Sequence, residues 1–454
     1  MNESLNRYLA VIITVQLSLM LCMAASTASA QSVAVVNSNN NKITQWYTAN
    51  GMKVLFMAEH SLPMADFRLV FDAGSARDRN SDTWYSGLAN ITNRLIFEGT
   101  REMNSDQIAD AFADIGVNYG NGIDRDTAKI YLRCLTEAKI LDSAIETLSN
   151  VLENADFPEQ AVERERKRIL VEIMHELQTP VKRNSRLFYL VLYGSHPYAS
   201  PLSGSRKVIK KLTREQILSF YRQYYTAQNA VLAIVGDLNK QQARQVSERL
   251  SRALPTGRKA PQLPRVIKIE QPKFINKNLP SSQTTVFMGQ AAVKRGDPDY
   301  FPFYVGNYIL GSFGARLMKD IRLKRGLTYT IESVLIPMKE TGPFLIRFST
   351  QPAAVNVVLD LIAINLNRFL TLGPTPLELQ QAKTFITSYF PFRTDSNQDM
   401  VENLADIGFY NLPLSYLDDY ISNIQAVTRE QIIEVFRRRI EMKEMLTVSV
   451  GPKE

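Results

Sequence analysis

Two segments of the chain carry nearly the same pattern of apolar and polar positions. The stretch LTREQILSFYRQYY at 212–225 and the stretch VTREQIIEVFRRRI at 427–440 each open with a threonine and continue with apolar residues at helical spacing. Each is followed by an apolar run, AVLAIVGDL at 230–238 and EMLTVSVGP at 444–452. The pattern predicts two helices with threonine N-caps, each leading into a strand.

A long amphipathic pair of helices is predicted upstream of each repeat, at 141–177 and at 358–390. A repeat on this scale indicates an internal duplication and two similarly folded domains. A chain of 454 residues is also too long for one ordinary hydrophobic core. The segment PTGRKAPQLPR at 255–265 has three prolines and no apolar periodicity, so it predicts a linker between domains at 31–254 and 266–454.

The strand pattern near the start of the first domain sets the expected fold class. In DFRLVFDAGS, Phe67, Leu69 and Phe71 alternate with Arg68 and Asp72, which predicts a strand with one buried face and one partly wet face. Each half opens with strands, and helices follow them. We therefore expect an α+β protein of two similar domains, each an antiparallel-rich sheet with helices packed on one face.

The N-terminus has the pattern of an export signal. Arg7 precedes an apolar run, and an A-x-A cleavage site ends at Ala30, so residues 1–30 are predicted to be a signal peptide. A permanent membrane anchor is less favoured, because Gln16 and Ser18 interrupt a short span. We expect a periplasmic or secreted protein with no membrane contact after cleavage, since no later segment approaches the ~20 apolar residues of a membrane helix.

Composition and charge exclude other classes. Apolar content of 45% and charged content of 22% are typical of a soluble globular protein. The formal net charge is +8, but the basic runs at 164–168 and 437–439 lie in helical stretches that also contain glutamate. These runs indicate solvated helix faces rather than a nucleic-acid surface. Cys134 is the only cysteine beyond the signal, and its alternating neighbours predict a buried strand position.

The stretch SGLANITNRLIFEGT at 86–100 has the spacing of a metal-binding helix without the ligands. A zinc site on a helix needs ligands at i and i+4, because that spacing places two side chains on one face. Here those positions hold Asn90 and Arg94, with Asn93 beside them. An amide and a permanently charged guanidinium do not supply zinc ligands, and Asn93 has no useful basicity.

The three histidines do not offer a replacement metal site. They are His60, His175 and His196, and no two of them have helical spacing. His196, in the stretch SHPYASP, is expected to be a hydrogen-bonding residue in a loop.

Four segments occur in an order that resembles the pitrilysin/insulinase family of zinc peptidases, which includes mitochondrial processing peptidase. They are FRLVFDAGSARD, GLANITNRLIFEGT, PYASPLSGSRKVIKKLTREQILSFYRQYYTAQNAVLAIVGDL and GARLMKDIRLKRGLTYT, and the resemblance extends over essentially the whole chain after the signal. The family carries an inverted zinc motif, H-x-x-E-H, on the second of these segments. Its two histidines fall on Asn90 and Arg94, and its catalytic glutamate falls on Asn93.

The resemblance also assigns what remains of the metal site. The family's third ligand, a glutamate on a later helix, matches Glu172, and its upstream companion matches Glu165. We expect no zinc in this chain. Arg94 stands where the second histidine would be, so its guanidinium is predicted to reach Glu172 in place of the metal. If that pair is buried, removing Arg94 should cost about 3 kcal/mol.

A second set of residues matches the family's substrate-binding residues in the second domain. Family members use an arginine and a tyrosine seven residues apart to hydrogen-bond the substrate backbone, and RLKRGLTY supplies Arg322 and Tyr329. Without the resemblance, Arg322 could simply face solvent and Tyr329 could fill a core position. Just before them, Gly311 and Gly314 in GSFGA are predicted to form a flexible turn, where related non-catalytic subunits carry a substrate-contacting loop.

Together these features predict a non-catalytic, exported subunit of a two-chain zinc peptidase. The resemblance implies a zinc-bearing sister subunit as its partner, with Arg322 and Tyr329 binding unfolded peptide substrate. Two alternatives stay open: a structural subunit, and a metal-free homodimer that binds peptides in the manner of a chaperone.

Overall fold

The structure is a computed structural model that describes residues 43–452 except 81 and 82. The predicted signal peptide at 1–30 lies outside the described residues. We refer to residues 43–254 as the first half and to residues 273–452 as the second half; each contains one large sheet.

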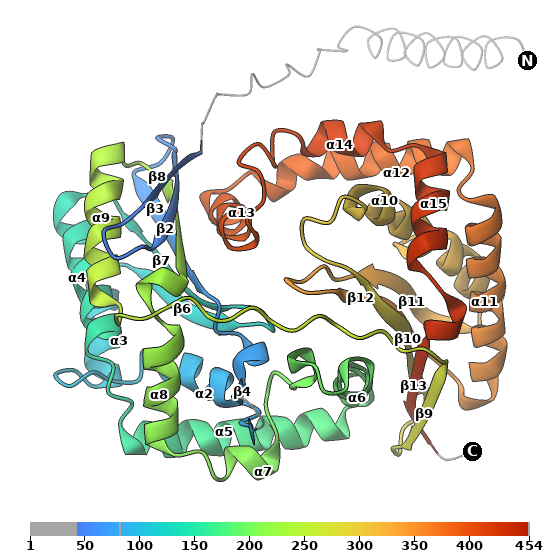
Figure 1. Ribbon diagram of the computed structural model, residues 1–454, viewed down its shortest axis with the longest axis horizontal. Helices are drawn as coiled ribbons and strands as arrows, with labels where there is room; N and C mark the ends of the chain where they lie inside the picture. Colours follow the sequence, from blue (N-terminus) through green and yellow to red (C-terminus); the bar gives the residue numbers. More distant parts are fainter. Residues whose placement is uncertain (1–42, 81–82, 453–454) are drawn as a thin grey trace, which may run out of the picture. The chain divides into compact units, whose positions relative to one another are not determined.

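The sheet of the first half has the strand order β1-β2-β8-β3-β7-β6 (Figure 1). Its neighbouring strands are antiparallel except β2 and β8, which run parallel. The strands are β1 (Thr44–Tyr47), β2 (Lys53–Ala58), β3 (Met64–Phe71), β6 (Asn118–Ile123), β7 (Ala128–Leu135) and β8 (Ala230–Gly236); a short hairpin, β4 (Arg79–Asn80) and β5 (Thr83–Trp84), follows β3.

The sheet of the second half repeats this topology in the order β11-β12-β10-β13-β9. The parallel pair here is β9 and β13, which corresponds to β2 and β8 of the first half; the edge strand β1 has no counterpart in the second sheet. The matching order confirms the two similar folds that the repeated sequence pattern predicts. The strands are β9 (Lys273–Asn278), β10 (Thr284–Val293), β11 (Thr328–Leu335), β12 (Gly342–Thr350) and β13 (Leu446–Gly451).

The two repeated helices have the predicted N-caps. Thr213 caps α8 and Thr428 caps α15, and in both cases the side-chain oxygen of the glutamine three residues later accepts a hydrogen bond from the N–H of the N-cap threonine. Each helix is followed by a strand that takes part in the parallel pair of its sheet. This strand is β8, which pairs with β2, or β13, which pairs with β9. The helices of the first half are α2 (Leu88–Arg94), α3 (Ser105–Ala113), α4 (Ala138–Glu153), α5 (Glu159–Gln178), α6 (Pro180–Tyr193), α7 (Arg206–Ile209), α8 (Arg214–Tyr224) and α9 (Lys240–Ala253).

The predicted helix pairs of the duplication correspond to α4 with α5 and to α11 with α12. A separate short segment, η4 (Met318–Leu323), is wound as a π-helix. The other helices of the second half are α10 (Tyr300–Gly311), α11 (Val355–Leu372), α12 (Pro376–Tyr389), α13 (Asn397–Tyr410), α14 (Tyr420–Ala426) and α15 (Arg429–Arg439), with a 3₁₀ turn, η6 (Phe390–Arg393), after α12.

The two halves exchange one helix each (Figure 1). The side chains of α13, from the second half, pack on strands β2, β3 and β8 of the first sheet. In return, α6 of the first half packs on β10 and β13 of the second sheet. The buried amide of Asn184 on α6 donates hydrogen bonds to the carbonyls of Thr285 and Val448, at 2.7 and 2.9 Å. Thus each sheet has helices of its own half on one face and a helix of the other half on the opposite face.

This exchange corrects the expectation for strand β3. The alternation around Arg68 predicts a partly wet face, yet Val70 and Arg68 are both buried. The reason is α13, whose Glu402 pairs with the Arg68 guanidinium while apolar residues of the helix cover the rest of that face. The prediction that helices pack on one face of each sheet is therefore correct only for helices of the same half, because a helix of the other half covers the opposite face.

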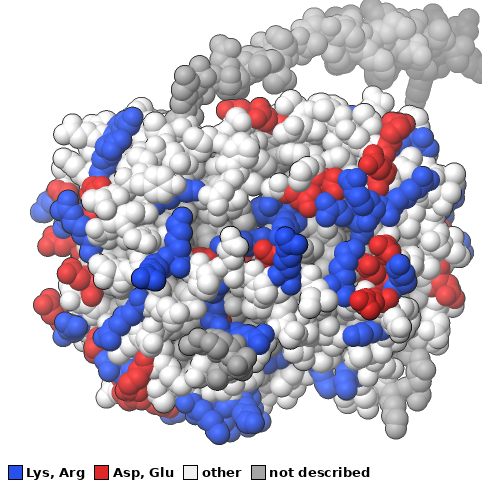
Figure 2. Space-filling model, viewed as in Figure 1, with Lys and Arg blue, Asp and Glu red and all other residues white. Residues whose placement is uncertain are grey.

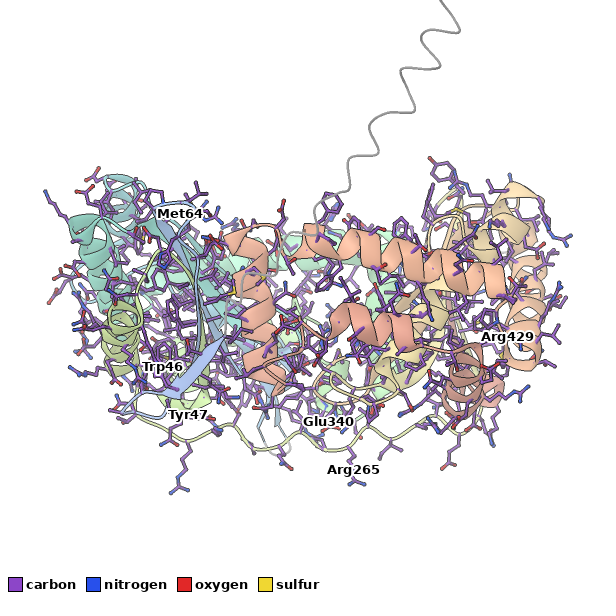
Figure 3. All side chains as sticks on the ribbon, turned by 90° about the horizontal axis from the view of Figure 1, so that it is seen from above. Trp46, Tyr47, Met64, Arg265, Glu340 and Arg429 are labelled. Carbon is purple, nitrogen blue, oxygen red and sulfur yellow. The ribbon has the colours of Figure 1, made fainter. Side chains whose placement is uncertain are left out.

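The predicted linker lies in an extended segment between α9 and β9 that runs along one side of the molecule (Figures 1 and 3). The composition of this segment suggests a flexible linker, but the segment packs on the folded chain. Leu263 and Ile269 are buried in the same apolar cluster as side chains of α6. The carbonyl of Pro264 accepts a hydrogen bond from Nε2 of His196 at 2.9 Å, and Nδ1 of His196 accepts from the N–H of Tyr198. His196 is therefore the loop hydrogen-bonding residue that was predicted. The exact domain boundaries stay a prediction.

A buried polar cluster joins the halves near Glu340, which Figure 3 places in the middle of the molecule. The carboxylate of Asp126 accepts hydrogen bonds from the hydroxyl of Tyr198 at 2.5 Å, from the N–H of Lys339 at 2.8 Å and from the hydroxyl of Tyr410 at 3.2 Å. The Tyr198 hydroxyl in turn accepts from the N–H of Glu340. Burial raises the pKa of Asp126 to about 6, although the Tyr198 hydrogen bond opposes the shift.

Two further expectations concern apolar segments. Cys134 is a free, buried strand cysteine as predicted, and burial raises the pKa of its thiol to about 12. The expectation that no later segment could span a membrane needs correction, because among the described residues one helix, Pro352–Leu372, is long and apolar enough by length and composition. That helix contributes Val358, Ile362 and Leu366 to the core of the second half.

Candidate functional site

The candidate metal-site helix is α2, whose start is fixed by the buried carboxylate of Asp78. Asp78 accepts hydrogen bonds from the N–H groups of Gly87 and Ala89, each at 2.8 Å, and from the hydroxyl of Ser200 at 2.7 Å. Gly87 has a φ of 102°, a backbone conformation that glycine adopts without strain. Burial raises the pKa of Asp78 to about 7, against the effect of these donors. The contacts anchor α2 against the first sheet.

Asn93, at the position of the family's catalytic glutamate, has a packing role. Its side-chain amide donates to the hydroxyl of Tyr225 at 3.3 Å, and Asn121 of strand β6 donates to its carbonyl. Tyr225 is fully buried and its ring stacks against Tyr221. An amide held in this way binds α2 to the core and offers no base to a reacting water.

Arg94 takes the place of a metal ion between α2 and α5. Its Nη1 and Nη2 atoms donate to the two carboxylate oxygens of Glu172, at 2.9 and 2.6 Å, and its Nε donates to the side-chain oxygen of Asn90 at 3.1 Å. Nη1 also lies 3.5 Å from the carboxylate of Glu165, which accepts a second ion pair from Arg168. The structure therefore brings together the positions that the sequence comparison aligned with the zinc site.

This arrangement does not fit a zinc ion. Both oxygens of Glu172 are engaged by one planar guanidinium, which is a strong bidentate pairing. Glu165 and Glu172 are balanced by Arg94 and Arg168, so no excess negative charge is left to attract a cation. No group of three or more histidine, cysteine, aspartate or glutamate side chains suitable for a metal occurs in the part of the chain that the structure describes.

The second candidate site lies at the edge of the other sheet. Arg322 is in the short π-helical segment η4, and Tyr329 is the second residue of the edge strand β11. The Arg322 guanidinium lies over the Tyr329 ring, 4.8 Å from its centroid, which is a cation–π contact. The Tyr329 side chain is exposed, at 72%, so it does not fill the core.

A β-bulge directs Tyr329 outward. Thr328 and Thr330 pair with consecutive residues of β12, Thr350 and Ser349, so Tyr329 has no partner in the register. The hydroxyl of Thr328 stabilises the bulge by donating to the carbonyls of Thr330 and Ser349. Bulges at sheet edges often re-aim a side chain in this way. Among the described residues no carboxylate pairs with Arg322, and its N–H groups and the Tyr329 hydroxyl are available as donors.

The two glycines of GSFGA differ in role. Gly311 ends α10 and is buried, and a β-carbon there would lie 2.3 Å from the hydroxyl oxygen of Ser333. The prediction that Gly311 belongs to a flexible turn is wrong. Gly311 lies in α10, and its lack of a side chain permits close packing of α10 on β11. Gly314 does form the turn, with a φ of 75° and open space around it. Between them, Phe313 is largely exposed.

Some important residues were not singled out from the sequence. Asp78 and Asp126 carry buried carboxylates that fix α2 and the contact between the halves. The stretch containing Tyr198 was noted as part of a family segment, but its hydroxyl bridge to the second half was not foreseen. A tyrosine next to two prolines and a histidine in a loop gives little indication of a partner more than a hundred residues away.

The fold and these two sites define a two-domain peptidase-like protein whose metal-ligand positions are substituted. Residues 53–205 match Insulinase (Peptidase family M16), and residues 211–386 match the Peptidase M16 inactive domain. The chain belongs to peptidase family M16.

Some relatives of this chain are named zinc proteases, and one is named a non-peptidase homolog. A Rickettsia felis protein named an uncharacterized zinc protease is 27% identical over 386 residues, which cover 83% of this chain and 90% of the relative. A Helicobacter pylori protein named non-peptidase homolog YmxG is 24% identical and covers 88% of this chain and 92% of the relative.

Solved structures confirm the fold. The structure of a peptidase M16 inactive domain from Pseudomonas fluorescens is 36% identical, with a TM-score of 0.87, and the match covers 91% of this chain and 98% of that one. A protease from Helicobacter pylori has the same fold with a TM-score of 0.82, at 18% identity.

Proposed function

We propose that this chain is the non-catalytic subunit of an exported two-chain zinc peptidase. Its sister subunit would carry the zinc ion, and this chain would supply Arg322 and Tyr329 to bind the peptide substrate. The observation that carries the proposal is the contrast between the two sites. Arg94 closes the metal position, whereas Arg322 and Tyr329 present free donors at an exposed sheet edge.

The chemistry of Arg322 and Tyr329 suits a peptide backbone near the bond to be cleaved. A guanidinium and a phenol both donate hydrogen bonds without gaining or losing a proton at neutral pH. Donors of this kind stabilise the negative charge that develops on a carbonyl oxygen in the transition state of peptide hydrolysis. The stacking of Arg322 on Tyr329 restricts both side chains, so less conformational entropy is lost when they bind substrate.

The edge position of β11 adds main-chain recognition. Strand β11 pairs only with β12 in the sheet, so its other edge offers unpaired N–H and C=O groups. An extended peptide can bind such an edge by forming one more strand. The bulge at Tyr329 ends regular pairing at the start of this edge, which places the Tyr329 hydroxyl beside such a peptide.

The relatives are consistent with loss of catalysis in this chain. The Helicobacter pylori relative is named a non-peptidase homolog, and the Pseudomonas fluorescens structure is named an inactive domain. The requirement for a zinc-bearing sister follows from the substituted ligands, and export follows from the predicted signal peptide. The spread of basic and acidic side chains over the face in Figure 2 also favours a solvated surface over a nucleic-acid patch.

A two-part experiment tests the proposal. Affinity purification of the tagged chain from its own cells should recover a second M16 chain that contains an H-x-x-E-H motif, and the purified pair should cleave unfolded peptides that neither chain cleaves alone. Recovery of a homodimer with no zinc-bearing sister would contradict the proposal and favour a metal-free peptide-binding protein. A pair that assembles but whose activity is independent of Arg322 and Tyr329 would leave this chain a structural role.

A further inference from the structure

A row of four aromatic side chains lies on the second half, with three of them exposed and the fourth, Tyr308, partly buried. Tyr308 of α10 stacks on Phe385 of α12, with ring centroids 5.2 Å apart, and Phe385 stacks on Tyr389 at 6.0 Å with an interplanar angle of 9°. Phe392 of η6 continues the row, 5.8 Å from Tyr389. We call these four residues the aromatic strip. Phe385, Tyr389 and Phe392 are 54%, 55% and 68% exposed.

Of the aromatic strip, only Tyr308 packs against the core of the second half. Helix α12 already contributes Ala382 and Ile386 to that core from its other face. Soluble proteins seldom expose several large aromatic rings side by side, and contiguous apolar patches commonly mark binding sites. Phe385 and Tyr389 stack on each other, and the Phe392 ring is tilted by 39° against Tyr389, so these ring contacts restrict the side-chain orientations.

The two ends of the aromatic strip lie in hollows of the surface. At one end, Phe385 and Tyr308 line a cavity of about 210 Å³ together with Phe313 and Lys319. Lys319 belongs to the same short helical segment as Arg322, three residues along the chain.

At the other end, Tyr389 and Phe392 line a cavity of about 350 Å³. Its lining also includes Arg68 and Lys129 of the first sheet and the α13 carboxylates Asp399, Glu402 and Asp406. The strip thus runs from the GSFGA turn into the space between the two halves. A hollow of this size admits an extended chain but not the surface of a folded domain.

We propose that the aromatic strip binds extended peptides that carry aromatic or other large apolar side chains at alternate positions. The spacing supports this occupant, because side chains on one face of an extended peptide recur about every 6.6 Å, close to the ring separations of 5.2–6.0 Å along the strip. The inference rests on the proposed function and deepens it, since it names the substrate class as unfolded segments rich in aromatic residues.

The test uses the full exported chain and two labelled peptides of otherwise identical, unstructured sequence. One peptide carries phenylalanine at three alternate positions, and the other carries serine there. Fluorescence anisotropy should show that the chain binds the phenylalanine peptide at least tenfold more tightly than the serine peptide. Phe385→Ser and Tyr389→Ser should each weaken binding of the phenylalanine peptide by about tenfold and leave binding of the serine peptide unchanged.

Leu377→Ser is the matched control. Leu377 is on the same helix and is 62% exposed, but it does not belong to the stack, so this variant should bind both peptides as the original chain does. Circular dichroism and thermal melting show whether each variant is folded. A folded Phe385→Ser variant that still prefers the phenylalanine peptide would overturn the inference, and so would equal weakening by Leu377→Ser.

The outcomes separate this inference from the proposed function. Binding to the isolated chain measures the aromatic strip and needs no sister subunit. Cleavage by the reconstituted pair, with and without Tyr329→Phe, measures the proposed function. If Phe385→Ser abolishes capture of the sister subunit while peptide binding is unchanged, the strip is a surface for that subunit and the inference is wrong.

Discussion

Arg94 donates hydrogen bonds to both carboxylate oxygens of Glu172, at positions that the sequence resemblance aligns with zinc ligands of the family. The pair is only partly buried, because the Glu172 side chain is 40% exposed. A cost of about 3 kcal/mol for Arg94→Ala, expected for a buried pair, is therefore too high. The fully buried partner, Glu165, keeps its ion pair with Arg168 when Arg94 is removed.

We expect Arg94→Ala to lower the free energy of unfolding by about 1 kcal/mol, since solvent screens a half-exposed ion pair. Urea denaturation measures the change, and a double-mutant cycle with Glu172→Gln isolates the pairwise part. A loss of 3 kcal/mol or more would show that the carboxylates are effectively desolvated.

The remaining geometry predicts that zinc binding can be restored. Asn90→His, Asn93→Glu and Arg94→His together rebuild the inverted motif at i and i+4 opposite Glu172, and they free its carboxylate. We expect the triple variant to hold about one zinc ion per chain by elemental analysis, whereas the original chain holds none. Adding Glu172→Gln should weaken this binding. A folded triple variant without zinc would mean that α2 and α5 are no longer placed for ligation.

The Tyr329 hydroxyl should matter for cleavage and not for assembly. Tyr329→Phe keeps the ring under the Arg322 guanidinium and removes only the donor. In the reconstituted pair we expect the catalytic rate to fall by about 100-fold to 1000-fold, the usual effect of losing one transition-state donor. Arg322→Lys should have a similar effect, because an ammonium group does not reproduce the planar fork. Size-exclusion chromatography checks that the pair still forms.

Stability should fall as the pH rises from about 5 to 7.5. Burial raises the pKa of Asp126 to about 6 and that of Asp78 to about 7, so the folded chain holds protons that the unfolded chain releases above pH 4. Each carboxylate must then be ionised inside the protein as the pH rises. Asp126→Asn should flatten the part of this slope below about pH 6.5.

The matched control is Glu378→Gln. The Arg316 and Thr375 hydrogen bonds outweigh burial and hold the pKa of Glu378 at about 2. Its contribution to stability is therefore complete above pH 5, and the variant should lose the same amount at every pH from 5 to 8. Urea denaturation at several pH values distinguishes the two behaviours; an unchanged slope in Asp126→Asn would contradict the assignment.

The sequence predicted the features that depend on local pattern. The Thr213 and Thr428 capping boxes and the strands after them follow from residues within one helical turn. The contact between Arg94 and Glu172 was also predictable, because both residues align with metal-ligand positions of the family that the sequence resembles. The exchange of α6 and α13 between the halves was not predictable. The apolar face of each helix indicates that the helix is buried but not which sheet it packs on.

The same limit explains the errors at individual residues. Arg68 alternates with apolar residues, which is typical of a strand with one solvent-exposed face, and it is buried because the distant helix α13 packs on that face and pairs Glu402 with it. Gly311 is a turn residue by composition, but its role is set by contact with Ser333 on another element. The bulge that exposes Tyr329 depends on the register of β11 against β12, which the local sequence does not encode.

The reciprocal placement of α6 and α13 means that the sequence repeats do not mark separable parts. If the connecting segment were cut, each isolated fragment would expose the sheet face that the other fragment's helix covers, with Val70 and Val231 on one and Phe287 and Val448 on the other. Neither fragment would be soluble by itself, yet the two produced together would complement each other like the pieces of a split reporter. The two copies of one fold therefore form a single folding unit.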